Sequence, residues 1–231
     1  MKIAVISDIH SNLEALETVI SNLPDYDNLI CLGDIVGYGP QPNEVVERLR
    51  ELTPTIVLLG NHDNAVVTGD TSDFSHHAAV AVEWTRARLD PKNVTYLSEL
   101  QPSERLEIAN TAVGLYHGSP NDPLSEYVYP GMPASSAKEL IRKSGARLVL
   151  LGHTHVPMLY DLRGDMLGNP GSVGQPRDGD PRASFAIMTV NNGESYSFDI
   201  RRIDYEIRKV AEKILDAGLP RFLADRLYTG M

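Results

Sequence analysis

The sequence predicts an α/β fold, more closely an α+β sandwich in which mixed β-sheets are flanked by helices. Three observations support this prediction. Short apolar runs alternate with helical patterns in the N-terminal half of the chain. Each of these apolar runs ends in a polar turn. Later apolar runs occur in pairs separated by turn residues, which is typical of antiparallel hairpins.

Three apolar runs in the N-terminal half predict strands at residues 3–6, 29–32 and 55–59. These runs are short and apolar throughout, as expected for parallel strands that are buried on both faces. Apolar residues at helical spacing predict helices at residues 13–23 and 42–52. The repetition of strand, loop and helix indicates parallel strands that are joined by crossover helices.

The rest of the chain is less regular. Helices are expected at residues 78–89, 135–143, 205–215 and 221–227. A hairpin is expected from residues 106–109 and 113–116, and another buried strand from residues 148–151. Four runs predict antiparallel strands at residues 158–162, 166–167, 185–190 and 195–200. Because no repeat or linker interrupts the chain, we expect one domain over residues 1–231, with C-terminal helices from about residue 204.

The composition excludes several classes of protein. The chain has 231 residues, a formal net charge of −10 and one cysteine, Cys31, so it cannot form an intramolecular disulfide. The acidic balance disfavours proteins that bind long nucleic acids or anionic membranes. No apolar run approaches the ~18 residues that span a bilayer, and the N-terminus lacks a signal-peptide pattern. We therefore expect a cytoplasmic protein.

Polar side chains follow the predicted strands. In chain order they are Asp8, His10, Asp34, Asn61, His62, Asp63, His117, His153 and His155, and all of them except His62 and Asp63 form a set of seven candidate metal ligands. Because the carboxyl ends of parallel strands share one edge of a sheet, we expect these residues to meet there. Imidazole nitrogen and oxygen ligands suit manganese, iron, zinc or nickel. The set is too large for one tetrahedral ion and fits two ions that share a carboxylate.

Five short motifs resemble those of a known family. They are Asp8-Ile9-His10, Gly33-Asp34, Gly60-Asn61-His62-Asp63, His117-Gly118 and Gly152-His153-Thr154-His155. Each is common alone, but in this order, each after a predicted strand, they resemble the calcineurin-like metallophosphoesterase superfamily. The sequence looks most like its small bacterial and archaeal phosphodiesterase branch, which residues 34–40 and 169–172 also resemble. The resemblance spans residues 1 to about 200.

The resemblance implies that two divalent metal ions divide the ligands between them. Asp8, His10 and His155 would hold one ion, Asn61, His117 and His153 would hold the other, and Asp34 would bridge the two. Manganese is the first expectation, with iron, zinc or nickel as alternatives. His62 matches the family's non-ligand histidine, which would stabilise the phosphate or protonate the leaving oxygen while a metal-bridging hydroxide attacks phosphorus.

We therefore expect a hydrolase that cleaves a phosphoester bond, most simply a phosphodiesterase acting on a small or nucleotide-like substrate. The alternatives are a phosphomonoesterase and a non-catalytic scaffold that retains the fold. Protein phosphatases of the superfamily carry an Asp and an Arg just after the bridging aspartate. This chain has Ile35-Val36-Gly37-Tyr38 there, which makes phosphoprotein phosphatase activity a weaker expectation. The C-terminal helices are expected to pack on the core or to form a contact in a homo-oligomer.

Asn12, Tyr38 and Arg177 are candidates for contacts with the substrate. Asn12 could instead cap the helix that begins near residue 13, and Tyr38 could only shape its glycine-rich loop. The guanidinium fork of Arg177 matches phosphate, but pairing with a nearby aspartate is an equal alternative.

Four other polar residues are assigned no role in catalysis at this point. Arg182 is expected to pair with Asp178 or Asp180 at the surface. Asp63 is expected either to cap the following helix or to orient a partner of the ligands. His76 and His77 lie outside every motif, so an exposed helical face is favoured for them.

Overall fold

The computed structural model describes residues 1–231 and is built around two five-stranded sheets. The first sheet has the order β10-β9-β1-β2-β3 and contains β1 (Lys2–Ile6), β2 (Asn28–Cys31), β3 (Ile56–Val57), β9 (Ala183–Asn191) and β10 (Ser195–Ile203). The second has the order β4-β5-β6-β8-β7 and contains β4 (Ser103–Ile108), β5 (Thr111–Tyr116), β6 (Leu148–Leu151), β7 (Met158–Asp161) and β8 (Met166–Asn169). Strands β1, β2 and β3 run parallel along one side of the first sheet, and β5, β6 and β8 run parallel in the middle of the second. Antiparallel strands complete both sheets.

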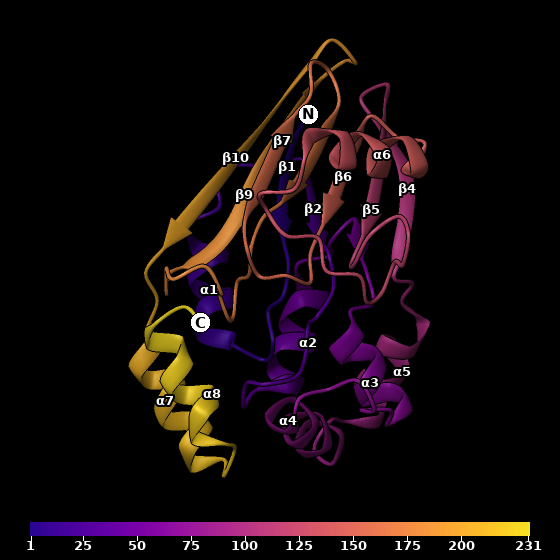
Figure 1. The fold of residues 1–231 in the computed structure, drawn as a ribbon. Helices are drawn as coiled ribbons and strands as arrows, with labels where there is room; N and C mark the ends of the chain where they lie inside the picture. Colours follow the sequence, from indigo (N-terminus) through magenta and orange to yellow (C-terminus); the bar gives the residue numbers. More distant parts are fainter.

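Eight α-helices surround the sheets (Figure 1). They are α1 (Leu13–Ser21), α2 (Pro42–Glu51), α3 (Asn61–Thr68), α4 (His76–Arg86), α5 (Pro91–Glu99), α6 (Ala134–Ser144), α7 (Ile207–Asp216) and α8 (Arg221–Asp225). In the view of Figure 1 the strands fill the upper part of the molecule, and α3, α4, α5, α7 and α8 lie below them. None of the helices is long and apolar enough to cross a membrane.

The two faces of β1 enter different cores because successive side chains of a strand point in opposite directions. Ile3 and Val5 belong to the core between the two sheets, whereas Ala4 and Ile6 belong to the core between the first sheet and the helices. Strands β2 and β6 divide their side chains in the same way between inner and outer clusters. This alternation produces the layered sandwich that the sequence predicts.

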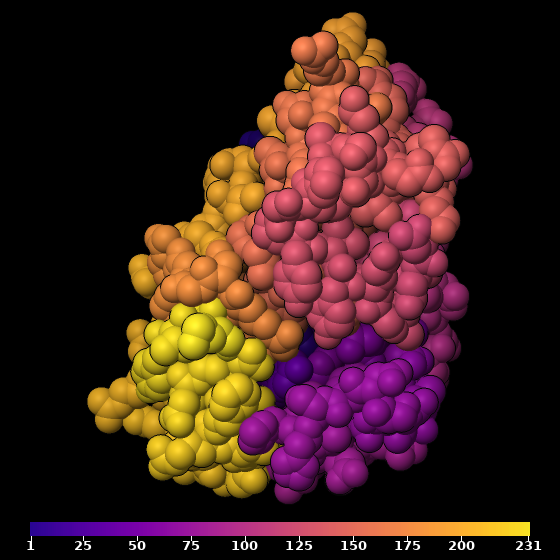
Figure 2. Space-filling model, viewed as in Figure 1, coloured from indigo at the N-terminus to yellow at the C-terminus, as the bar shows by residue number.

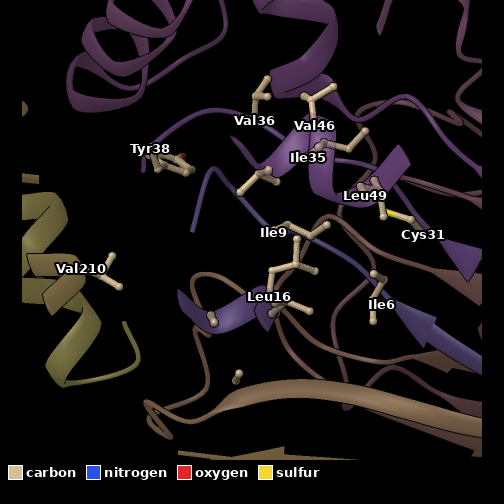
Figure 3. Close-up of a cluster of buried hydrophobic side chains, with 14 of the residues drawn as sticks. Ile6, Ile9, Leu16, Cys31, Ile35, Val36, Tyr38, Val46, Leu49 and Val210 are labelled. Carbon is tan, nitrogen blue, oxygen red and sulfur yellow. The ribbon is translucent and has the colours of Figure 1, made fainter. Parts of the chain in front are cut away.

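The helix-side core extends from the sheet to the C-terminal helices. Figure 3 shows Ile9, Leu16 and Ile35 in this cluster, together with Val210 of α7. Because α7 buries Val210 and Ile214 in the core that contains α1, it packs on the domain's own core.

Most predicted elements are confirmed, with three corrections. Strand β8 pairs parallel with β6 and antiparallel only with β7, because its short run lies between them in the sheet. Residues 60–63 are predicted as the polar turn that ends a strand, but Asn61 begins helix α3. Helix α5 was not predicted, although Pro91 stands at its first position, where proline is favoured.

An ion pair connects α7 to α1. Glu14 Oε1 lies 2.5 Å from Lys213 Nζ and 3.2 Å from Lys209 Nζ, and its side chain is 8% exposed. Burial raises the pKa of Glu14, but the two ammonium groups outweigh burial and hold it below the usual 4.5. The stabilisation is therefore present above pH 4.5 and is lost as the pH falls through the lowered pKa of the folded state.

We expect Glu14→Gln to lower the free energy of unfolding at pH 7, because it removes the charge that pairs with both lysines. The loss should be only about 1 kcal/mol, since solvent partly screens the two lysines. The matched control is Glu212→Gln. It removes an exposed ion pair with Arg208 within α7 and should change the free energy of unfolding little. Urea denaturation at pH 7 and at pH 4 measures both effects. The difference between wild type and Glu14→Gln should shrink at pH 4, and a difference that grows there would contradict this assignment.

Candidate metal centre and cleft

The structure brings the predicted metal-binding side chains together at the carboxyl ends of the strands. Asp8 and His10 follow β1, Asp34 follows β2, His117 follows β5, and His153 and His155 follow β6. Asn61 is the first residue of α3, just after β3. The parallel strands of both sheets therefore have their carboxyl ends at one place, which is where ligands bind in α/β proteins.

Two groups of these side chains have ligand atoms within 4.8 Å of one another, and both contain Asp34. The first group is Asp8, His10, Asp34 and His155; the second is Asp34, His117 and His153. Asn61 joins the second group, because its Oδ1 lies 3.1 Å from Nε2 of His117. The side chains are therefore grouped in space as the family resemblance divides them.

Asp34 lies between the two groups. Its Oδ2 is 3.4 Å from Nε2 of His10 and 3.5 Å from Nε2 of His117. Its Oδ1 accepts a hydrogen bond of 2.8 Å from the backbone N–H of His62, which fixes the orientation of the carboxylate. One oxygen of Asp34 therefore faces both groups while the other is anchored to the start of α3.

Backbone carbonyl groups orient the histidines. Nδ1 of His10, His117 and His155 donates to the carbonyl oxygens of Val36, Leu32 and Gln175 respectively. When each ring is neutral, Nδ1 carries its proton and Nε2 presents a lone pair to the centre. His153 is oriented the other way, since its Nε2 donates to the Ser125 carbonyl and leaves Nδ1 as the lone-pair nitrogen.

The donor set fits divalent cations. Both oxygens of Asp8 and Oδ2 of Asp34 are buried without a hydrogen-bond partner. Nε2 of His10 and Nε2 of His155 lie 3.0 Å apart, although both are lone-pair nitrogens in the tautomers described above. Buried carboxylates and lone pairs that face one another repel unless a positive charge lies between them. Nitrogen and oxygen donors of this kind suit first-row transition metals.

The charges of the centre strongly perturb its pKa values. Burial, reinforced by Asp34, raises the pKa of Asp8 to about 7. Burial opposes protonation of His117, but Asp34 and Asp8 together raise its pKa to about 9, so a bound cation would take the place of the proton on Nε2. Burial lowers the pKa of His153 to about 3, and His117 lowers it further. Groups shifted this far are typical of functional sites.

The backbone of the centre is strained. Asp8, His10, Asp34, His153 and His155 all have positive φ angles, between 50° and 66°. The left-handed conformation costs non-glycine residues about 1–2 kcal/mol each, and such residues cluster at functional sites. The surrounding fold therefore holds these side chains in place against their own backbone preference.

Asp63 ties two of the loops together. Its carboxylate accepts hydrogen bonds from the backbone N–H groups of Gly60, Ile35 and Val36, at 3.0, 3.2 and 2.9 Å. These bonds connect the start of α3 to the loop that follows Asp34. Asp63 thus combines the two roles considered for it, because it caps α3 and orients the loop that carries a candidate ligand.

Three other features hold the loops closely packed. Asn169 Nδ2 donates to the carbonyl oxygen of Gly152 at 2.7 Å, just before His153. Ser172 Oγ donates to the carbonyl oxygen of Asp8 at 2.7 Å. Gly60 leaves no room for a side chain, since a Cβ there would lie 2.0 Å from Oδ1 of Asp34.

His62 lies beside the centre and is almost fully buried. Its ring packs against Tyr38, Phe74 and His10, with centroid distances of 4.3, 4.7 and 4.8 Å. Its Nδ1 has no hydrogen-bond partner, consistent with the absence of an aspartate in the loop after Asp34. Burial lowers the pKa of His62 to about 4, with Asp34 opposing and Arg177 reinforcing the shift.

The three candidates for substrate contacts are placed differently. Tyr38 and Arg177 line a cleft next to the centre, and Arg177 donates to Gln175 rather than to an aspartate. Asn12 does not line this cleft. Its Oδ1 caps α1 by accepting from Ala15 N–H, and its Nδ2 donates to the Gly174 carbonyl.

The remaining polar residues have clear partners. Arg182 pairs with Asp180 at 2.7 Å, as predicted. His76 is exposed, also as predicted. His77 differs from the prediction, because it is half-buried and its ring stacks on Phe222 of α8 at a centroid distance of 4.8 Å.

The cleft has a volume of about 810 Å³ and opens over the centre. Figure 2 shows the hollow between the C-terminal helices in yellow, the α3–α4 region in purple and the pink segment around residues 120–155. Its walls include four residues that the sequence analysis did not select: Phe74, Tyr127, Phe222 and Arg226. They lie in loops and in the C-terminal segment, where no motif or periodicity marks them.

Comparisons with known proteins agree with this geometry. Residues 1–193 match the model of the calcineurin-like phosphoesterase superfamily domain. The crystal structure of a metallophosphoesterase from Sphaerobacter thermophilus is 38% identical with a TM-score of 0.83, and the match covers 100% of this chain and 99% of that one.

Two sequence relatives extend the comparison. The uncharacterized protein MJ0912 of Methanocaldococcus jannaschii is 36% identical over 247 residues, which cover 99% of this chain and 98% of that protein. Phosphodiesterase YfcE of Escherichia coli is 26% identical over 200 residues, which cover 81% of this chain and 87% of that protein. With a family model that matches most of its length and a buried cluster suited to metal ions, the chain belongs to the calcineurin-like phosphoesterase superfamily.

Proposed function

We propose that this protein is a binuclear metal-dependent phosphodiesterase that acts on a small phosphate ester. The observation that carries the proposal is the position of Asp34, whose Oδ2 lies within 3.5 Å of a histidine from each of the two ligand groups. A shared carboxylate of this kind suits two ions that act together on one phosphoryl group. Family membership and the name of the YfcE relative support the same class of reaction.

The ligands divide as the geometry groups them. Asp8, His10 and His155 would hold one cation, Asn61, His117 and His153 would hold a second, and Asp34 would contact both. Manganese is the metal we propose, since imidazole and carboxylate ligands accommodate it. Two such cations supply Lewis acidity that polarises the phosphoryl group and makes water acidic enough to act as a nucleophile near neutral pH.

His62 is proposed as the acid that assists the leaving oxygen. With a pKa lowered to about 4 by burial, its ring is neutral at pH 7 before substrate binds. A bound phosphate anion favours the imidazolium and therefore raises this pKa. The packing of Tyr38 and Phe74 around the ring supports this role, because it fixes the ring beside the centre, from where it would protonate the leaving oxygen.

The cleft favours a diester over a monoester, and the loop after Asp34 disfavours phosphoprotein phosphatase activity. The cleft is large enough for substituents on both ester oxygens, and Phe74, Tyr127 and Phe222 provide apolar walls for them. The loop after Asp34 also lacks the aspartate and arginine that accompany the bridging aspartate in protein phosphatases of the superfamily.

The proposal is tested by comparing bis(p-nitrophenyl) phosphate with p-nitrophenyl phosphate in the presence of Mn²⁺, with metal analysis of the same sample. We expect faster turnover of the diester and loss of activity after chelation. Faster turnover of the monoester would indicate a phosphatase, and metal-replete protein that cleaves neither ester would favour the scaffold alternative.

Asp34→Asn is expected to lower kcat/KM for the diester by about 100-fold or more and to reduce the manganese content, because it weakens a ligand common to both positions. Asp216→Asn, an exposed change on α7, is the matched control and should leave both quantities unchanged. Wild-type activity in Asp34→Asn would show that Asp34 is not a shared ligand.

His62→Ala is expected to keep the manganese content of the wild type but to lower kcat by about 10²- to 10⁴-fold, since only proton transfer and phosphate stabilisation are lost. His76→Ala removes an exposed histidine outside the cleft and should retain full activity. The role assigned to His62 is wrong if its removal depletes the metal or leaves kcat unchanged.

A further inference from the structure

Two arginines from distant parts of the chain meet at the ring of Tyr38. The guanidinium carbons of Arg177 and Arg226 lie 5.5 and 5.9 Å from its centroid. Arg177 belongs to the loop between β8 and β9, and Arg226 begins the 3₁₀ turn that follows α8, beyond the residues that match the family model. Both arginines line the cleft.

No Asp or Glu side chain pairs with either arginine. Arg177 donates to the amide oxygen of Gln175, and Arg226 donates through Nε alone to the main-chain oxygen of Met231, the last residue. The terminal nitrogens of Arg226 make no hydrogen bond within the chain. By contrast, both aspartates of the Arg177 loop are used elsewhere, since Asp178 pairs with Arg202 and Asp180 pairs with Arg182.

This arrangement is unfavourable on its own. Arg226 is half-buried, and burial, reinforced by the nearby Arg177, lowers its pKa to about 10. In a chain with a net charge of −10, acidic side chains are plentiful, yet no Asp or Glu pairs with either arginine. Two arginines that line one cleft without an Asp or Glu partner are characteristic of a site that binds an anion.

A backbone hydrogen bond and close packing hold the segments that carry the two arginines together. The backbone N–H of Gly179, in the Arg177 loop, donates to the carbonyl oxygen of Gly230 at 2.9 Å. Gly230 has a φ of +63°, and a Cβ there would lie 2.7 Å from the backbone of Asp180. Leu227, next to Arg226, is buried in the helix-side core. The C-terminal turn is therefore attached to the loop whose cation it meets.

The pair extends from the metal centre toward the mouth of the cleft. The backbone N–H of Arg177 donates to the carbonyl oxygen of His155, a candidate ligand. The guanidinium of Arg226 lies 5.2 Å from the ring centroid of Phe222, whose side chain is half exposed. The metal ions and His62 would already stabilise the charge of the scissile phosphate. Arg226 is thus placed to bind a different group of the substrate.

We propose that Arg226, together with Arg177, forms a subsite for a second phosphate group, so that the substrate is a phosphodiester that carries an additional phosphate. The planar guanidinium fork matches phosphate oxygens and binds them with paired hydrogen bonds. The proposal rests on the phosphodiesterase function proposed above and narrows its substrate class.

Two synthetic substrates test the subsite. Thymidine 5′-(p-nitrophenyl phosphate) and the same ester with a 3′-phosphate share a leaving group and a nucleoside and differ only in the second phosphate. With Mn²⁺, the wild type should prefer the 3′-phosphorylated ester in kcat/KM by about tenfold or more. Arg226→Gln should remove most of this preference, chiefly by raising KM for the 3′-phosphorylated ester, and Arg226→Lys should retain part of it.

Arg221→Gln is the matched control, because Arg221 is an exposed arginine of α8 outside the cleft and should not affect the preference. A wild type without preference, or an Arg226→Gln variant that loses activity equally on both esters, would overturn the subsite while leaving the phosphodiesterase proposal intact.

Direct binding separates the two proposals if neither ester is cleaved. Calorimetry would then compare thymidine 3′,5′-bisphosphate with thymidine 5′-monophosphate. Tighter binding of the bisphosphate that Arg226→Gln abolishes would support the subsite although the proposed activity had failed. Equal binding of both nucleotides would overturn the subsite as well.

Discussion

The structure depends on the burial of Asp8 and Asp34 beside four histidines at the meeting point of two sheets. Three of the four carboxylate oxygens have no donor within the chain. Backbone carbonyl groups hold one nitrogen of each histidine, which leaves the other nitrogen directed at the centre. A buried anion without a partner is costly, so a fold that builds such a site is suited to bind cations. The proposed metal-dependent chemistry follows from that requirement.

The surrounding architecture holds this arrangement in place. Parallel strands from both sheets end at the centre, and the ligands lie on the short loops that follow them. Five of the ligands adopt left-handed backbone conformations that only close packing maintains. Asp63 connects two of these loops through three backbone hydrogen bonds, and Asn169 and Ser172 connect two more. The rigid core between the sheets thus positions groups that lie more than a hundred residues apart in sequence.

The sequence predicted what depends on local pattern. Short apolar runs located the strands, and because parallel strands end on one edge, the polar residues after them could be grouped into one site. The sequence did not predict that Asn61 begins a helix. The start of this helix is held by hydrogen bonds between Asp63 and the backbone of Ile35 and Val36, and local sequence does not record such long-range contacts. The pairing of β8 with β6 and the wall formed by Phe222 and Arg226 depend on tertiary packing, which periodicity does not record.

The central claim is that Asp34 is shared between two metal ions. Electron paramagnetic resonance of the Mn²⁺-loaded protein tests it most directly, because two manganese ions joined through a carboxylate are magnetically coupled. The account predicts a spectrum of coupled manganese in the wild type that is lost in Asp34→Asn. A wild-type spectrum of isolated Mn²⁺ alone, at full metal occupancy, would contradict it.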